Sequence, residues 1–211
     1  LAPLPVRRLW GVGKVTERKL IAAGYRTIAQ IQNASPLVLQ HILGNQGPIL
    51  HNLSLGLDNR PIQADRQIKS IGDESTYETD LSDISKIERE IAIHSDIVAQ
   101  RLRKHHLQAR TISIKIRFAS FRTLTRSRSI EEGTNLQEDI DNIARDLLSH
   151  LFFSEGIRLI GVTASNLTPE ISIPSLFSKE KEKRTKAAKT MDDIQKKFGK
   201  KALQKGFWLE K

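Results

Sequence analysis

The chain has 211 residues, of which 38% are hydrophobic and 27% are charged, a composition that is typical of a folded globular protein with one or two cores. It has no cysteine, which excludes disulfides and thiolate sites, and no run of the roughly 20 apolar residues that a membrane helix needs. We therefore expect a cytoplasmic protein with no membrane partner, and the formal net charge of +10 favours a polyanion such as nucleic acid.

Positive charge is concentrated in three parts of the chain. Residues 1–66 and 171–211 each carry more Lys and Arg than Asp and Glu. Residues 101–128 hold nine basic residues and no acidic one, whereas the acids of the middle region lie before and after this stretch, largely on two expected helices. Sorting of this kind is typical of a surface that binds a polyanion on one side.

Residues 1–66 are expected to form a small all-helical domain. Glycine follows three of the expected helices, and it ends helices well because it readily adopts the left-handed conformation. A polar connector, residues 58–66, then breaks the helical pattern. The expected helices are 14–23, 28–33, 36–43 and 48–55.

Residues 67–170 are expected to form a β-α-β-β-α-β domain. Between Thr111 and Phe118, isoleucines alternate with Thr, Ser, Lys and Arg, which indicates a strand with one buried face and one polar, basic face. Thr134 and Gln137 match a capping box before the second helix. We expect an α+β fold, in which two helices cover one face of a four-stranded antiparallel sheet. The expected elements, in order, are 69–79, 83–104, 112–118, 123–130, 136–151 and 157–166.

Residues 171–211 are expected to form a basic, mobile tail. A Lys/Glu-rich run from Lys179 to Lys189 favours a mobile linker or tail. The spacing of Met191, Ile194 and Phe198 indicates a short terminal helix.

The first candidate site is Gly11-Val12-Gly13-Lys14, at the start of an amphipathic helix. It resembles the helix-hairpin-helix motif. Glycines let a phosphate approach the backbone, and the amides and dipole of a helix N-terminus favour an anion. The alternative is an ordinary tight turn without a ligand.

The second candidate site is the basic stretch from Arg101 to Arg128, whose densest part, Arg117 to Arg128, combines Arg with Ser and Thr. These residue types bind phosphate oxygens through charge and hydroxyl hydrogen bonds. The alternative is a solvated strand face, although such faces usually mix both signs of charge. Aromatic residues make up 5% of the chain, which argues against RNA recognition by base stacking.

Several separated segments, in order over about residues 3–167, resemble the thumb and little-finger domains of Y-family translesion DNA polymerases. The first is Trp10 to Lys14, followed by Leu20 to Gly24 and Thr27-Ile28. The others are Lys69-Ser70-Ile71-Gly72-Asp73-Glu74, Thr125-Arg126-Ser127 and Ile157-Arg158-Leu159-Ile160-Gly161-Val162.

This resemblance implies that the chain grips duplex primer–template DNA through its phosphate backbone during lesion bypass and DNA repair. Gly11, Val12, Gly13 and Lys14 would hold a primer-side phosphate. The residues implied to line the backbone in the little finger are Lys69, Ser70, Ile71, Gly72, Lys115, Arg117, Arg126, Ser127 and Arg128.

The resemblance also implies that catalysis lies outside this chain. The palm, whose carboxylates hold Mg²⁺ in this family, would precede Leu1. We therefore expect no catalytic residue, metal site or cofactor here. The fragment alone should be inactive, although the full-length protein would be a DNA-directed DNA polymerase, a nucleotidyltransferase.

Two parts of the tail carry resemblances of their own. Ser175-Leu176-Phe177 is similar to the end of the peptide that binds the bacterial sliding clamp, although Ile173 and Pro174 depart from that pattern. Asp192 to Trp208 resembles the C-terminal end of the bacterial DNA polymerase IV type.

Two other classes of function stay open at this stage. One is a free-standing DNA-binding adaptor that is not an enzyme. The other is a helix-hairpin-helix nuclease subunit, which would need a carboxylate cluster that the sequence does not offer.

Overall fold

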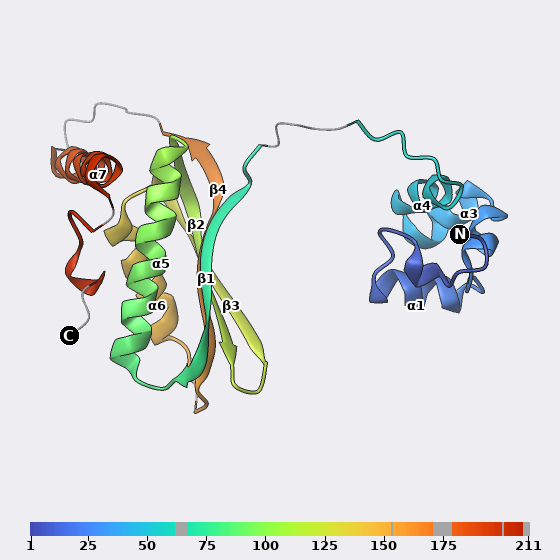
Figure 1. Ribbon diagram of the computed structural model, residues 1–211, viewed down its shortest axis with the longest axis horizontal. Helices are drawn as coiled ribbons and strands as arrows, with labels where there is room; N and C mark the ends of the chain where they lie inside the picture. Colours follow the sequence, from blue (N-terminus) through green and yellow to red (C-terminus); the bar gives the residue numbers. More distant parts are fainter. Residues whose placement is uncertain (62–66, 153, 171–178, 200, 209–211) are drawn as a thin grey trace. The chain divides into compact units, whose positions relative to one another are not determined.

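The computed structural model describes residues 1–61, 67–152, 154–170, 179–199 and 201–208. The chain divides into two compact units, Leu1–Arg66 and Gln67–Lys211 (Figure 1), which we call the helical unit and the sheet unit. No helix among the described residues is long and apolar enough to cross a membrane.

The helical unit packs short helices around a small apolar core. The expected helices are present, and Gly24, Gly44 and Gly56 at their ends have positive φ angles of 90°, 63° and 80°. α3 and α4 approach closely at Gly47, where a Cβ atom would lie 2.3 Å from the backbone of Leu39. The elements are η1 (Val6–Arg8), α1 (Lys14–Ala22), α2 (Ile28–Gln32), α3 (Pro36–Leu43) and α4 (Gln46–Ser54). The core residues are Val6, Leu9, Leu20, Ile28, Ile31, Leu39 and Leu50.

The sheet unit is a four-stranded antiparallel sheet with two long helices on one face, which confirms the α+β fold expected from the sequence. The strand order is β1-β4-β2-β3, so each long helix connects two strands that are separated by one other strand. The elements are β1 (Ser70–Leu81), α5 (Ile84–Lys104), β2 (Leu107–Phe118), β3 (Thr123–Thr134), α6 (Gln137–Ser149) and β4 (Ile157–Pro169).

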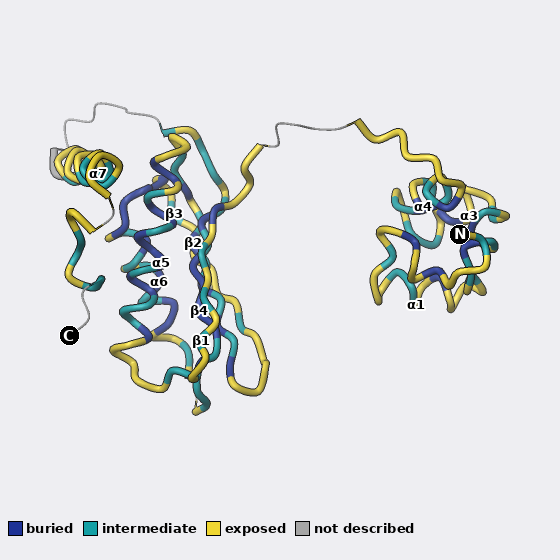
Figure 2. The backbone as a smooth tube through the Cα atoms, in the orientation of Figure 1, coloured by how far each residue is buried: buried dark blue, intermediate teal, exposed yellow. Residues whose placement is uncertain are grey.

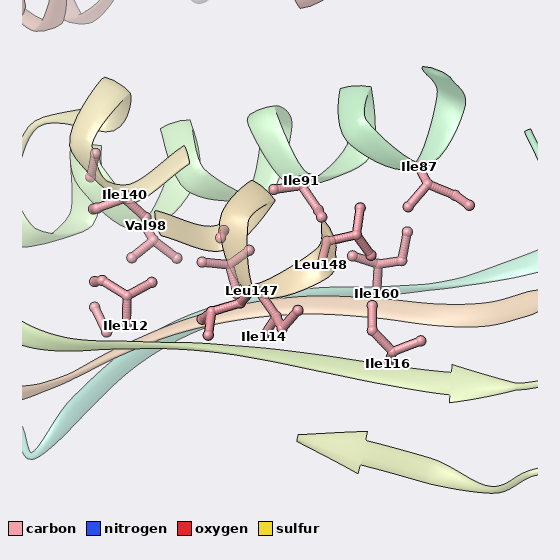
Figure 3. Packing of buried hydrophobic residues seen from close by; sticks show 14 of the residues in the cluster. Ile87, Ile91, Val98, Ile112, Ile114, Ile116, Ile140, Leu147, Leu148 and Ile160 are labelled. Atoms are coloured by element: carbon pink, nitrogen blue, oxygen red, sulfur yellow. The ribbon is translucent and has the colours of Figure 1, made fainter. Parts of the chain in front are cut away.

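The core of the sheet unit lies between the helices and the sheet (Figure 3). Ile112, Ile114 and Ile116 of β2 are at most 1% exposed, and they face apolar side chains of α5 and α6. The buried residues follow this single interface (Figure 2), so the opposite face of the sheet takes no part in the core.

The expected capping box of Thr134 and Gln137 is not formed. Leu136, two residues after the end of β3, is the N-cap of α6, and its N–H donates to the Thr134 hydroxyl at 3.2 Å. The same hydroxyl donates to Asp139 at 2.6 Å. Gln137 instead accepts a hydrogen bond from Lys205, at 3.0 Å.

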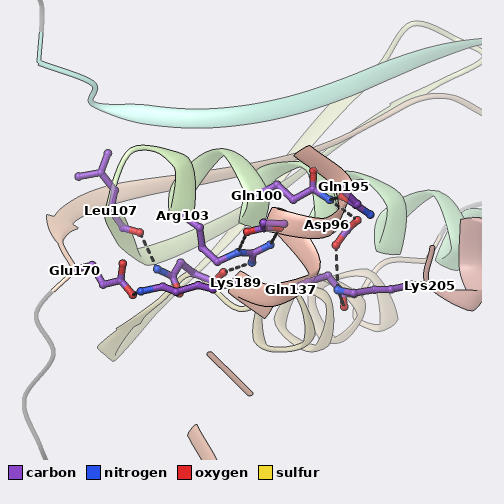
Figure 4. Close-up of polar contacts among 11 residues, drawn as sticks. Asp96, Gln100, Arg103, Leu107, Gln137, Glu170, Lys189, Gln195 and Lys205 are labelled. Atoms are coloured by element: carbon purple, nitrogen blue, oxygen red, sulfur yellow. Dashed lines mark hydrogen bonds and ion pairs between the residues drawn. The ribbon is translucent and has the colours of Figure 1, made fainter. Parts of the chain in front are cut away.

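The described part of the tail is helical, whereas the sequence suggested only a short terminal helix. α7 (Lys179–Phe198) and η2 (Gly206–Trp208) lie on the side of α5 and α6 that faces away from the sheet (Figure 1). Ion pairs hold this layer in place (Figure 4), among them Arg103–Asp192 at 2.6 Å and Lys205–Asp96 at 3.0 Å. Charged residues of the tail, both basic and acidic, thus pair with residues that lie far away in the sequence, which charge counting along the chain could not reveal.

Arg103→Ala should destabilise the sheet unit more than removal of an exposed arginine. Arg103 is 6% exposed and donates to Asp192 and to the Asn135 carbonyl, so its loss leaves both acceptors without their donor. We expect the free energy of unfolding to fall by about 1–3 kcal/mol. Arg128→Ala, which breaks an exposed pair with Asp146, should cost at most about 1 kcal/mol. Urea denaturation tests this difference, and equal losses would contradict it.

Candidate nucleic-acid interface

The glycine turn of the helical unit is fixed by contacts on its inner side. Gly11 has a φ angle of +88°, and its carbonyl accepts a hydrogen bond from the Gln46 side chain at 2.9 Å. The Val12 N–H donates to the Leu9 carbonyl at 3.1 Å. The turn therefore has a defined shape before any ligand binds.

The outer side of this turn leads into the N-terminus of α1. Gly13 is the N-cap in an extended conformation, and a Cβ atom there would meet nothing within 4 Å. The first backbone N–H groups of a helix have no partner within the helix, and Lys14 beside them is exposed. The arrangement suits a phosphate, as the sequence motif suggested.

An aromatic residue to which the sequence pattern assigned no binding role also lies at this turn. Trp10 is 68% exposed, and the Arg60 guanidinium lies 4.4 Å from its ring centre. Arg60 in turn donates to Asp58 at 2.7 Å, and this hydrogen bond lowers the pKa of Asp58 to about 2. The stack fixes the start of the connector against the turn, within the helical unit.

The sheet unit presents a second candidate surface, the face of the sheet that points away from α5 and α6. Strand register sets four rows of side chains across it. We call this surface the hydroxyl face, because ten of its sixteen residues are Ser or Thr. Its rows, from β1 to β3, are Ser70–Ser165–Thr111–Ser129, Gly72–Thr163–Ser113–Ser127, Glu74–Gly161–Lys115–Thr125 and Thr76–Leu159–Arg117–Thr123.

Short polar side chains make the hydroxyl face suitable for close contact with a phosphate backbone. A hydroxyl both donates and accepts, and hydroxyls form many of the contacts that proteins make with phosphate oxygens. Thr111 and Ser129 hydrogen-bond each other at 2.9 Å, and Arg117 donates to the Thr123 hydroxyl at 2.9 Å. Lys115 lies 2.9 Å from a carboxylate oxygen of Glu74.

The pairing of β3 with β2 places Ser127 and the two arginines of β3 on opposite faces of the sheet, although the sequence had suggested one surface for all three. Ser127 lies on the hydroxyl face, opposite Ser113. Arg126 and Arg128 are paired with Ile114 and Ile112, whose side chains enter the core, so these arginines lie on the helix side of the edge strand. Arg128 accordingly forms an ion pair with Asp146 of α6. The expectation that Arg126 and Arg128 share a face with Lys115 is therefore wrong, because side chains alternate along a strand.

The segment Lys69-Ser70-Ile71-Gly72 is divided in the same way. Ser70 and Gly72 belong to the hydroxyl face, and Lys69 is exposed just before β1. Ile71 is 8% exposed and belongs to the core, so its side chain lies on the helix side of the sheet and not on the hydroxyl face.

The basic stretch 101–128 is less positive in three dimensions than in sequence. Arg101 pairs with Asp73 at 2.9 Å, and Arg122 lies 3.3 Å from Glu155. Hydrogen bonding from Ser120 and Arg122 lowers the pKa of Glu155, which keeps it ionised. All four open-face positions of β3 carry hydroxyls, and so do two each in β2 and β4, which only the strand pairing brings onto one surface.

Two further expectations concern the clamp and a metal ion. Ser175, Leu176 and Phe177 lie outside the described residues. Within the part of the chain that the structure describes, no three His, Asp or Glu side chains form a group that could hold a metal ion.

A helical unit with a glycine turn at the start of a helix, followed by a sheet unit with one open polar face, matches the thumb and little-finger part of a Y-family DNA polymerase. Two family models support this class. The C-terminal domain of the impB/mucB/samB family matches residues 68–173, and the thumb domain of DNA polymerase-iota matches residues 7–58. The chain belongs to the impB/mucB/samB family.

The relatives of this chain are longer proteins. DNA polymerase IV of Desulfatibacillum aliphaticivorans is 34% identical over 204 residues, which cover 94% of this chain and 52% of the relative. DNA polymerase IV of Brucella melitensis is 32% identical over 209 residues, which cover 98% of this chain and 47% of the relative. The chain spans about half the length of these curated relatives.

A solved structure shares the fold. A Y-family DNA polymerase chimera, Dbh-Dpo4(243-245)-Dbh, matches with a TM-score of 0.59 and 19% identity. The match covers 79% of this chain and 48% of the chimera.

The two glycines of the turn should respond differently to alanine. Gly11→Ala should lower the free energy of unfolding of the helical unit by about 1–2 kcal/mol, because alanine is strained at a φ angle of +88°. Gly13→Ala should change it by less than about 0.5 kcal/mol, because the poorer N-cap is offset by the lower entropy of the unfolded chain. Thermal unfolding of the two variants measures this, and equal effects would contradict the assigned turn.

Proposed function

We propose that this chain holds primer–template DNA for a lesion-bypass DNA polymerase. The hydroxyl face contacts the phosphate backbone of the duplex, and the turn from Gly11 to Lys14 holds a primer-side phosphate. The observation that carries the proposal is the register of the sheet, which gathers ten hydroxyls with Lys115 and Arg117 on one open face.

Such a grip would depend little on base sequence. Hydroxyls, backbone amides and the cations Lys14, Lys115 and Arg117 would bind phosphate oxygens, which are the same at every position of the duplex. A polymerase that copies damaged templates needs this tolerance, because a lesion changes the base and leaves the backbone in place.

The chemistry of the whole protein is a proposal that rests on its relatives. Nucleotide addition with Mg²⁺ belongs to a part of the polymerase outside the described residues, and the described residues act by holding DNA. We place this activity in the cytoplasm. Family membership favours this proposal over the free-standing adaptor and the nuclease subunit.

Binding of a sliding clamp through Ser175, Leu176 and Phe177 is a separate proposal that rests on the sequence of the tail alone. Replacing Leu176 and Phe177 with alanine should abolish capture of the chain on an immobilised bacterial clamp, since these side chains would fill the apolar pocket. Unchanged capture would contradict the proposal.

The two faces of the sheet should contribute unequally to DNA binding. We expect the double variant Lys115→Ala with Arg117→Ala to bind DNA about tenfold more weakly near 0.1 M salt. The slope of log affinity against log salt concentration should become shallower by about 1 to 2. Arg126→Ala with Arg128→Ala removes the same charge from the other face and should change the affinity less than about twofold. The measurement is fluorescence anisotropy with a primer–template duplex over a salt series.

Equal losses in the two double variants would contradict the assigned face. No binding by the unmodified chain at low salt would overturn the proposed function itself.

A further inference from the structure

An ion pair on the hydroxyl face joins two strands that are not neighbours. β4 lies between β1 and β2, yet Lys115 of β2 lies 2.9 Å and 3.3 Å from the two carboxylate oxygens of Glu74 of β1. Both side chains therefore extend across the central strand, on the surface where the proposed DNA backbone would lie.

The residue under this ion pair is glycine. Register places Gly161 directly between Glu74 and Lys115. A Cβ atom at position 161 would lie 2.8 Å from the Cβ of Glu74, so a side chain there would displace the carboxylate. In the other three rows of the hydroxyl face, β4 contributes Ser165, Thr163 and Leu159 at this position. The glycine thus leaves a gap in this row alone, which the ion pair occupies.

The ion pair between Glu74 and Lys115 involves half of the positive charge on the hydroxyl face. Glu74 is the single acidic residue among the sixteen that define the hydroxyl face, and it contacts one of the two cations there. Its side chain is 50% exposed and that of Lys115 is 35% exposed, so both are open to a ligand. A carboxylate offers a cation two oxygens much as a phosphate does.

We propose that Glu74 competes with DNA for Lys115. Its carboxylate pairs with Lys115 in the DNA-free chain, and a phosphate of the DNA must displace it. The inference rests on the proposed function of the same face. The competition keeps the affinity for DNA moderate and speeds dissociation of the DNA, because the Glu74 carboxylate can pair with Lys115 again as soon as the phosphate leaves. Exposed ion pairs are weak, so Glu74 reduces the affinity without blocking binding.

Glu74→Gln tests the competition, since glutamine keeps the shape of the side chain and removes its charge. We expect the variant to bind a primer–template duplex about two- to fivefold more tightly near 0.1 M salt, the effect of one exposed ion pair. The slope of log affinity against log salt concentration should steepen by up to about 0.9, because a free Lys115 adds one full phosphate contact.

Glu78→Gln is the matched control. Glu78 is exposed on the same strand and has no ion pair among the described residues, so its loss makes the same change in net charge without freeing a lysine. We expect its affinity and salt dependence to stay near those of the unmodified chain. Unfolding midpoints should agree within about 3 °C, because both substitutions are at exposed sites.

Three outcomes would overturn the inference. If Glu74→Gln and Glu78→Gln tighten binding equally, with the same salt dependence, the effect is one of net charge and Glu74 has no special role. If Glu74→Gln weakens binding, the ion pair supports the interface and does not compete with DNA. In both cases the proposed function stands, whereas failure of all three proteins to bind DNA would remove the proposed function and the inference with it.

Discussion

Side chains alternate between the two faces of a sheet, and pairing of the strands decides which face each residue joins. In the sheet unit, Ile112, Ile114 and Ile116 must all be buried under α5 and α6, which fixes the register of β2 against its neighbours. A slip of one residue would bury Lys115 and Arg117 and expose the isoleucines. The hydrophobic core therefore also sets the composition of the open face.

The second consequence of this arrangement is a separation of charge within the sheet unit. Carboxylates of α5 and α6 face away from the sheet and bind basic residues of the tail, as in the pairs Lys205–Asp96 and Arg184–Asp139. Carboxylates of α5 and α6 thus neutralise part of the positive charge of the tail within the sheet unit. The open face keeps few charges, and short hydroxyl side chains with two glycines, Gly72 and Gly161, make up most of its surface.

Patterns among residues that are near in sequence made most of the helices and strands predictable. The features that were not predicted depend on contacts between residues far apart in sequence. The period of the isoleucines identified β2 and α5, and the glycines identified the helix ends, because each depends on near neighbours in sequence. Arg126 and Arg128 were assigned to the wrong face because their side depends on pairing with β2. The buried contact of Arg103 with Asp192 was missed because 89 residues separate the two.

The most direct test of the DNA-binding face is a chemical-shift map of the isotope-labelled chain, recorded by NMR while a primer–template duplex is added. The account predicts that the largest changes in the sheet unit occur at residues of the hydroxyl face, such as Ser113 and Thr163, with little change at Asp146 and Arg128 on the helix side. Changes centred on α5, α6 or α7 with an unchanged hydroxyl face would contradict it.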